Sequence, residues 1–213
     1  MQYTKAAVIV ETRNLSNLTD IILQHTKFLD LSWNLHIFCS DDNYETLRRN
    51  FPTANITNLH LSHLTANQYN ELLTNVWFWK QIIGMKVLIF QSDSMLLRKG
   101  IDEFLEWDYV GAPWTFQEHG GNGGLSLRTK QKMIEVIQTY PYSKSLHGNE
   151  DVYFSNHLPK LERAKLAPRE VCKKFSCESI PELGTLGYHA IEKYMDEETV
   201  TRIKTQYVSN TQS

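Results

Sequence analysis

Hydrophobic and polar positions divide the first half of the chain into buried strands and amphipathic helices. Three largely apolar runs end in polar residues and predict strands, at residues 6–10, 35–39 and 87–90, and the continuous runs at 6–10 and 87–90 are typical of strands that are covered on both faces. A shorter alternating stretch at residues 56–61 predicts a fourth, weaker strand. Apolar residues at helical spacing predict helices at residues 18–29, 44–50 and 67–83.

This alternation of strands and helices indicates an α/β fold with a doubly wound, mostly parallel central sheet. The second half is less regular, with short strands predicted at 108–114 and 125–127 and helices at 129–139, 152–158 and 192–204. No repeat or low-complexity linker interrupts the chain, so residues 1–213 are predicted to form a single domain whose halves meet near residue 98. The polar stretch 206–213 is predicted to be a tail or a linker to a further, C-terminal domain.

Charge and cysteine content exclude several classes of protein. The 213 residues carry 22 Lys and Arg against 24 Asp and Glu, which argues against the basic face of a nucleic-acid-binding protein. No apolar run of about 18 residues exists, so no transmembrane segment is expected. Three cysteines, an odd number without metal-binding spacing, indicate reduced thiols and a cytoplasmic protein.

Polar residues follow three of the predicted strands and are candidates for binding a nucleotide. The set comprises Thr12, Arg13, Asp41, Gln91, Ser92 and Asp93. The carboxyl ends of parallel strands meet at one edge of a sheet, where ligands bind. Asp93 ends a buried strand, so it either meets a cation as part of a binding site or caps the following turn. Arg13 either pairs with a phosphate through its fork of donors or lies on the surface.

Three further motifs lie in the second half. Residues 120–124 contain four glycines but match neither the dinucleotide-binding pattern nor a P-loop, so Gly123 and Gly124 belong to a flexible loop or to a backbone that approaches a ligand closely. Glu150 and Asp151 precede a predicted helix, where acids either cap the helix or serve as a general base. His189, with a carboxylate, would supply the second type of ligand that a divalent metal accepts.

The order of these motifs resembles that of nucleotide-sugar glycosyltransferases of the GT-A fold. The strand ending in Gln-Ser-Asp is followed by Val-Gly-Ala-Pro-Trp at 110–114, Gly-Asn-Gly-Gly-Leu-Ser-Leu-Arg at 121–128, Asn-Glu-Asp at 149–151 and Leu-Gly-Tyr-His at 186–189. The resemblance covers residues 6–191 and is nearest to the N-terminal glycosyltransferase domain of a multi-domain chlorella-virus protein that builds capsid glycans. A viral origin would place the protein in the host cytoplasm.

The resemblance implies a metal-dependent enzyme that transfers a sugar from a UDP-sugar to a glycan acceptor, such as a glycan on a glycoprotein, with inversion of configuration. It implies a nucleotide-binding half at about 1–98 and an acceptor-side half at about 99–205. Manganese, or alternatively magnesium, would be held by Asp93 and His189. Gln91 replaces the first acid of the family's Asp-x-Asp motif, which implies weaker metal binding or a contact with the ribose or the sugar instead.

The same resemblance assigns roles on the acceptor side. Gly123 and Gly124 match the segment that lines the donor pocket. Glu150 and Asp151 match the acid pair beneath the acceptor, and they are adjacent, so both cannot face the site from a regular helix start. We expect Asp151 to be the base and Glu150 to hold the structure.

Two other functions remain open from the sequence. A sugar nucleotidyltransferase also has a doubly wound sheet and a metal, but it needs a glycine-rich loop after its first strand, and residues 10–14 contain no glycine. A non-catalytic carbohydrate-binding module would not need Asp93, Asp151 and His189 together.

Overall fold

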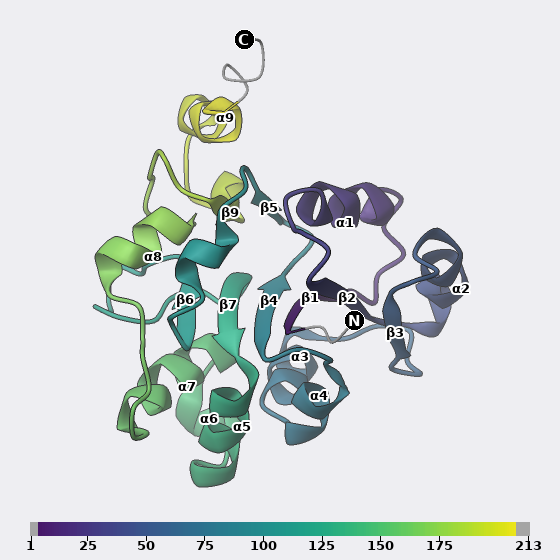
Figure 1. Ribbon diagram of the computed structural model, residues 1–213, viewed down its shortest axis with the longest axis horizontal. Helices are drawn as coiled ribbons and strands as arrows, with labels where there is room; N and C mark the ends of the chain where they lie inside the picture. The colour runs from purple at the N-terminus through teal and green to yellow at the C-terminus, as the bar shows by residue number, and fades with distance from the viewer. Residues whose placement is uncertain (1–3, 208–213) are drawn as a thin grey trace.

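The computed structural model describes residues 4–207 and contains a central six-stranded sheet (Figure 1). The strand order is β3-β2-β1-β4-β7-β6. The strands are β1 (Lys5–Val10), β2 (Trp33–Cys39), β3 (Asn55–Asn58), β4 (Lys86–Phe90), β6 (Tyr109–Gly111) and β7 (Leu125–Thr129). Strands β1 to β4 run parallel, and β7 runs antiparallel to its neighbours β4 and β6. The predicted α/β fold with a mostly parallel central sheet is confirmed.

Helices cover both faces of this sheet, because alternate side chains of β1 enter two separate cores. On one face, Ala7 and Ile9 pack with residues of α1 (Leu18–Thr26), α2 (Asp41–Asn50) and α8 (Arg169–Phe175). On the other face, Ala6 and Val8 pack with residues of α3 (Ala66–Leu73), α4 (Val76–Gln81), α5 (Lys130–Thr139) and α7 (Glu150–His157). Every residue of β1 is buried, as a continuous apolar run predicts for a doubly covered strand.

A second, three-stranded sheet lies beyond the end of β4. Its order is β5-β9-β8, with β5 (Ser94–Leu96), β8 (Ser176–Cys177) and β9 (Gly187–His189). Only three residues separate β4 from β5, and β5 pairs antiparallel with β9, which places Ser94 opposite His189. This pairing brings a residue near the end of the chain to the carboxyl end of the central strand.

The structure differs from the predicted elements in several places. The helix predicted at 67–83 is two helices, because the side chain of Asn75 accepts a hydrogen bond from the backbone N–H of Trp77 (2.8 Å) and starts α4 there. The helix predicted at 192–204 is a 3-10 turn (Ile191–Lys193) followed by α9 (Glu197–Thr205), which Asp196 caps. Other short elements have no periodic signal in the sequence: β5, α8, α6 (Lys144–His147) and 3-10 turns at Ile101–Phe104 and Leu158–Lys160.

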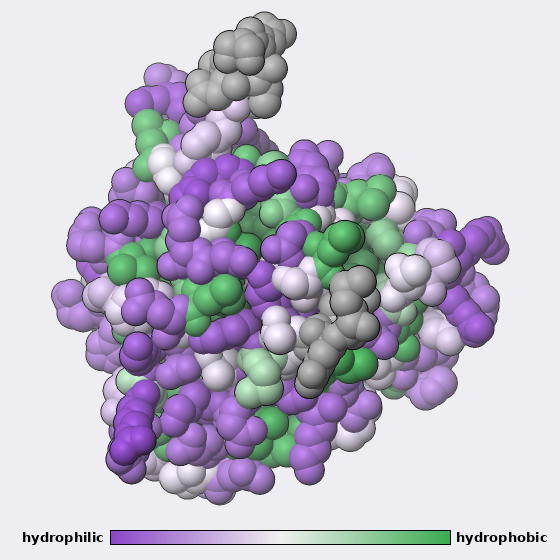
Figure 2. All heavy atoms as spheres, in the orientation of Figure 1, coloured by the Kyte–Doolittle hydropathy of each residue, from purple (hydrophilic) through white to green (hydrophobic). Residues whose placement is uncertain are grey.

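The surface and the cysteines agree with the composition. On the face shown in Figure 2, hydrophobic residues form small patches separated by hydrophilic ones. No helix within residues 4–207 is both long enough and apolar enough to cross a membrane. Cys39, Cys172 and Cys177 are buried and free. Most of the predicted tail at 206–213 lies outside the described residues.

Candidate active site

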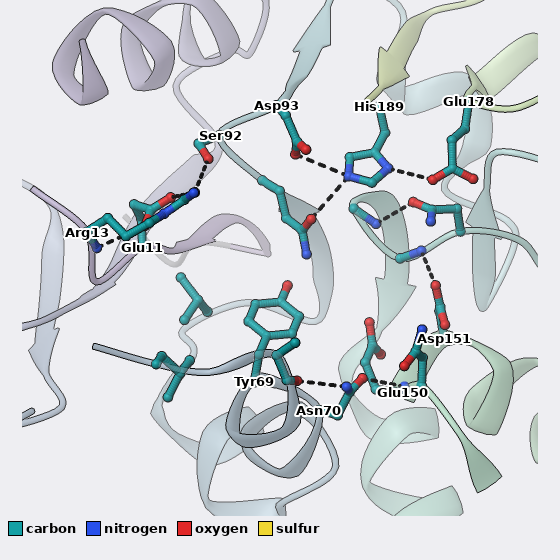
Figure 3. Close-up of a pocket in the computed structure, with 18 of the residues that line it drawn as sticks. Glu11, Arg13, Tyr69, Asn70, Ser92, Asp93, Glu150, Asp151, Glu178 and His189 are labelled. Atoms are coloured by element: carbon teal, nitrogen blue, oxygen red, sulfur yellow. Dashed lines mark hydrogen bonds and ion pairs between the residues drawn. The ribbon is translucent and has the colours of Figure 1, made fainter. Parts of the chain in front are cut away.

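A cavity of about 580 Å³ opens at the carboxyl ends of β1 and β4. Its volume falls within the range of roughly 300–1,000 Å³ that is usual for small-molecule sites. Ten of its residues are labelled in Figure 3. It is lined by residues from both halves of the chain, including Thr12, Arg13, Tyr69, Gln91, Ser92, Asp93, Gly123, Gly124, Glu150, Asp151, Glu178, His189 and Lys193.

Asp93 meets two cationic side chains, as a carboxylate at the end of a buried strand requires. Its Oδ1 lies 3.2 Å from Nε2 of His189, and its Oδ2 accepts a hydrogen bond from the ammonium of Lys193 (2.8 Å). The hydrogen bond with His189, supported by Lys193, holds the pKa of the Asp93 carboxyl well below its usual range. Asp93 therefore does not cap the next turn; it belongs to an ionic cluster on the cavity.

His189 is held between two acids and an amide. Its Nδ1 lies 3.0 Å from Oε1 of the buried Glu178, and its Nε2 lies 3.1 Å from Oε1 of Gln91 as well as near Asp93. Burial alone would lower the pKa of this imidazole, but the hydrogen bonds to Asp93 and Glu178 outweigh burial and raise the pKa to about 9. We call Asp93, Glu178, His189 and Lys193 the histidine end of the cavity.

Arg13 lies at the carboxyl end of β1 and is tied to two neighbours. Its Nε and Nη2 donate to the two carboxylate oxygens of the buried Glu11 (2.9 and 2.6 Å), and Nη2 also donates to Ser92 Oγ (2.8 Å). More than half of the Arg13 side chain remains exposed. The guanidinium therefore faces the cavity from a fixed position.

Thr12 and Asp41 have different positions. Thr12 lines the cavity, and its Oγ1 accepts a hydrogen bond from the backbone N–H of Leu64 (2.9 Å). Asp41 does not line the cavity: it is the first residue of α2, and its exposed carboxylate accepts a hydrogen bond from Asn58 on β3 (2.8 Å). The predicted helix at 44–50 begins at Asp41 instead, which turns this carboxylate toward β3.

Glu150, at the start of α7, is committed to a buried ion pair. Arg128 on β7 is fully buried and donates from Nη1 and Nη2 to the two carboxylate oxygens of Glu150 (2.5 and 2.9 Å). The backbone N–H of Glu150 donates to Asn70 Oδ1 (2.7 Å), so Asn70 caps α7 from α3. Glu150 thus holds structure, which is the role expected of one member of the acid pair.

Asp151 has no cationic partner of this kind within residues 4–207. Its Oδ2 accepts a hydrogen bond from the backbone N–H of Gly123 (3.1 Å), and its Oδ1 accepts one from Val152 (2.8 Å). Burial, together with the charge of Glu150, raises the pKa of Asp151 to about 6. A buried carboxylate with such a pKa is suited to accept a proton near neutral pH. We call Glu150 and Asp151 the carboxylate end of the cavity.

The glycine cluster is packed between these two ends and is not an open loop. A Cβ at Gly124 would overlap the imidazole of His189, and a Cβ at Gly123 would overlap the Glu150 carboxylate and Arg128. Both glycines are buried. The absence of side chains at these two positions lets His189, Glu150 and Arg128 pack directly against the backbone. The sequence had left open a flexible loop or a close approach of the backbone to a ligand; the structure shows a close approach, to side chains of the site.

The histidine end has a donor set that fits a divalent cation. Within residues 4–207, no three His, Cys, Asp or Glu side chains are arranged to hold a metal ion alone. Asp93 Oδ1 and Gln91 Oε1 nevertheless converge on His189 Nε2, and carboxylate, amide and imidazole groups are ligands that manganese accepts. Glu178 on the far nitrogen of the ring is the kind of outer carboxylate that orients a metal-binding histidine. Such a cation must take its remaining ligands from a bound diphosphate or water.

Four of the site residues were not singled out from the sequence. Glu178, Lys193, Tyr69 and Asn70 reach the cavity through packing between segments that are far apart in the chain. Lys193 could have been suspected from its position four residues after His189, since the 3-10 turn at this place brings its ammonium back to Asp93. The other three have no local pattern that would indicate their role.

Comparison with known proteins places the chain in a family and identifies its fold. A model of the family described as "Protein of unknown function (DUF5672)" matches residues 51–189. No curated protein matches the sequence.

Among solved structures, apo-form glycosyltransferase GlyE of Streptococcus pneumoniae TIGR4 is similar, with 12% sequence identity and a TM-score of 0.55 over 98% of this chain and 64% of that chain. Mannosyltransferase PcManGT of Pyrobaculum calidifontis, solved in complex with GDP-Man and Mn2+, has 16% identity and a TM-score of 0.50 over 77% of this chain and 55% of that chain. This chain therefore spans less than two thirds of either protein. At these identities the similarity shows a GT-A-like fold.

Proposed function

This chain belongs to the DUF5672 family, and we propose that it is a glycosyltransferase that moves a sugar from a UDP-sugar to a carbohydrate acceptor. One observation carries the proposal: a single cavity at the carboxyl ends of parallel strands joins the Asp93–His189 pair to the buried carboxylate of Asp151. In a sugar transfer, one end of a site must accommodate the leaving diphosphate and the other must activate the attacking hydroxyl. The GT-A-like fold, shared with solved glycosyltransferases, supports this assignment.

The charge of the cavity supports a requirement for a divalent metal. Five carboxylates line it, against three cationic side chains among the described residues: Arg13, Lys193 and the protonated His189. Adding a diphosphate to such a site is unfavourable unless a cation comes with it. Asp93, His189 and Gln91 would hold manganese, or alternatively magnesium, and the metal would stabilise the negative charge of the departing diphosphate.

Two permanent cations of the chain also face the position of the phosphates. Arg13 is fixed by Glu11 and Ser92, so it is already oriented toward an anion. The Lys193 side chain is more than half exposed and can move from Asp93 to a phosphate oxygen. Both contacts favour a diphosphate over an uncharged sugar.

Asp151 is the proposed general base. The acceptor oxygen attacks the anomeric carbon, the bond from that carbon to the β-phosphate oxygen breaks, and Asp151 takes the proton of the acceptor hydroxyl while UDP leaves. Attack from the face opposite the leaving group inverts the configuration. Glu150 cannot serve as the base while both of its oxygens accept from Arg128.

The two alternatives agree less well with the site. A sugar nucleotidyltransferase needs a glycine-rich loop after β1, and residues 10–14 contain no glycine. A non-catalytic module has no use for a buried carboxylate with a raised pKa.

The proposed acceptor is a glycan, such as one on a glycoprotein. Cytoplasmic location, a viral origin and a further C-terminal domain remain predictions from the sequence.

The test is release of UDP from a panel of UDP-sugars in the presence of manganese. We expect release from one of them, increased by an acceptor glycan and abolished by Asp93→Ala. Asp42→Ala is the matched control, because Asp42 is an exposed acid outside the cavity and its loss should leave turnover unchanged. Release of pyrophosphate from a sugar phosphate and a nucleoside triphosphate would show a nucleotidyltransferase. Sugar binding without turnover of any donor would show a binding module.

A further inference from the structure

Tyr69 on α3 has a buried hydroxyl without a hydrogen-bond partner. Four side-chain polar atoms in residues 4–207 are buried and unpartnered, and they belong to Asn34, His36, Tyr69 and Ser176. Tyr69 is the member of this set that lines the cavity. In Figure 3 its ring extends from α3 and directs the hydroxyl into the cavity, on the side of Asp93 and His189.

The surroundings of this hydroxyl keep it protonated. Burial, reinforced by the charges of Glu150 and Asp151, raises the pKa of Tyr69 well above its usual value. The nearby Gln91 side chain opposes this increase in part, but among residues 4–207 no group reaches the tyrosine oxygen with the distance and angles of a hydrogen bond. Tyr69 therefore offers one O–H donor and one acceptor oxygen that the protein itself leaves unused.

An unpaired buried polar group is unfavourable, so its presence in a cavity calls for an explanation. The position is also rigid: Thr65 caps α3 by accepting from the backbone N–H of Gln68, and Asn70, the next residue after Tyr69, bonds the N–H of Glu150. A flexible side chain could turn to another partner, whereas this ring is held by a helix that is fastened to α7.

We propose that the Tyr69 hydroxyl binds a hydroxyl group of the transferred sugar and helps to select the donor. This inference rests on the proposed function, in which the diphosphate lies at the histidine end and the acceptor at the carboxylate end. The sugar must then lie between them, and Tyr69 lies there: its neighbour Asn70 bonds Glu150 at the carboxylate end, while the Tyr69 hydroxyl extends toward Asp93 and His189 (Figure 3). Sugars present many hydroxyl groups, each able to donate and to accept, which matches what Tyr69 lacks.

The experiment compares Tyr69→Phe with the wild type by calorimetric titration in the presence of manganese. The probes are UDP alone and UDP-glucose, UDP-galactose, UDP-N-acetylglucosamine and UDP-rhamnose. For the UDP-sugar that the wild type turns over, we expect the variant to bind about 2- to 12-fold more weakly, the loss of one neutral hydrogen bond. Binding of UDP alone should not change. Deoxy analogues of that donor then identify the partner: the analogue that lacks it should bind wild type and variant equally well.

A thermal unfolding measurement separates recognition from structural support. Because the Tyr69 hydroxyl has no hydrogen-bond partner in the part of the chain that the structure describes, Tyr69→Phe should unfold at the same or a higher temperature than the wild type. Tyr109→Phe is the matched control: the Tyr109 hydroxyl is buried and donates to the Gly121 carbonyl (2.9 Å), so its loss should lower the unfolding temperature.

Each outcome decides the matter. Equal affinity of wild type and Tyr69→Phe for the UDP-sugar would refute the role of Tyr69 while leaving the proposed function intact. Equal weakening for UDP and UDP-sugar would assign the hydroxyl to the nucleotide and overturn the proposal for the sugar. A lower unfolding temperature of Tyr69→Phe with unchanged UDP-sugar binding would show that the Tyr69 hydroxyl supports the structure and does not recognise the sugar. A wild type that binds neither UDP nor any of the sugars would overturn both the proposed function and this inference.

Discussion

Neutralising the two neighbouring acids of α7 should change the stability of the protein in opposite directions. Glu150→Gln removes one member of a buried ion pair, whereas Asp151→Asn removes a buried charge that no Lys or Arg of the described residues pairs with. The two substitutions are adjacent in sequence, alike in chemistry and similar in burial, so each is the natural control for the other.

The expected loss for Glu150→Gln follows from the burial of Arg128. Its guanidinium has no exposed surface, and Glu150 is the carboxylate that pairs with it, whereas its Nε donates to the neutral hydroxyl of Ser126. Breaking such a pair from one side leaves an uncompensated buried charge, which typically costs about 3–5 kcal/mol. For a chain of this length each kcal/mol lowers the unfolding temperature by roughly 2–4 °C, so we expect a decrease of about 6–20 °C.

Asp151→Asn should have the opposite effect at neutral pH. The folded protein raises the Asp151 pKa from 3.8 to about 6, so the folded state binds this proton more tightly than the unfolded chain does. The contribution of Asp151 to stability is therefore complete below pH about 4 and is lost as the pH rises through about 6. The shift corresponds to about 3 kcal/mol at pH 7, which an uncharged asparagine would recover in part while its oxygen still accepts from Gly123.

Urea denaturation of both variants and the wild type from pH 4 to pH 8 tests these signs. The free energy of unfolding should be lower for Glu150→Gln throughout this range. For Asp151→Asn it should exceed that of the wild type at pH 7, and the difference should shrink as the pH falls toward 4. A destabilised Asp151→Asn at pH 7, or a difference that does not depend on pH, would show that Asp151 is a paired structural acid, and its assignment as the base would be abandoned.

Three other expectations concern activity and metal binding. The transfer rate should rise with pH through about 6 as Asp151 loses its proton, and Asp151→Asn should lower the rate by roughly 10²–10⁴-fold with normal donor affinity; a steady-state pH profile with saturating donor checks both. Gly124→Ala should displace the ring of His189 and weaken manganese-dependent UDP binding by at least about tenfold, measured by calorimetry, with an unchanged circular dichroism spectrum. Gln91→Asp should bind manganese more tightly in a titration followed by electron paramagnetic resonance, because it adds a second carboxylate beside Asp93; unchanged affinity would place residue 91 outside the metal site.

The fold could be predicted because its central strands are covered on both faces. Residues 6–10 and 87–90 had to be apolar throughout, and such runs are visible without any other information. Helix boundaries were harder to predict, since the break between α3 and α4 depends on a single capping side chain, Asn75, within an otherwise continuous apolar pattern. The short strand β5 is stabilised by pairing with β9, and such long-range pairing leaves no periodic signal.

In the candidate site, too, residues beside a recognisable element could be predicted, whereas residues brought in by long-range pairing could not. Asp93 and Asp151 could be selected because each follows or precedes a recognisable element. Asp41 was selected by the same argument but turns away, because α2 begins at that residue and not at Tyr44. Glu178 and Lys193 were not selected, because both depend on long-range pairing. Glu178 reaches His189 through the pairing of β8 with β9, and Lys193 reaches Asp93 through the β5–β9 pairing and the 3-10 turn after it.

The two ends of the cavity are joined by a single peptide bond. Gly123 donates its backbone N–H to Asp151, and Gly124 packs against the imidazole of His189, so adjacent residues fix the carboxylate end and the histidine end. Strand β7 continues directly from them and is hydrogen-bonded to β4, whose carboxyl end leads to Asp93. The spacing between the proposed base and the proposed phosphate site is therefore set by the core of the sheet. Catalysis depends on holding reacting groups at a fixed separation. Gly123 and Gly124 set the distance between the carboxylate end and the histidine end, and a side chain at either position would change that distance.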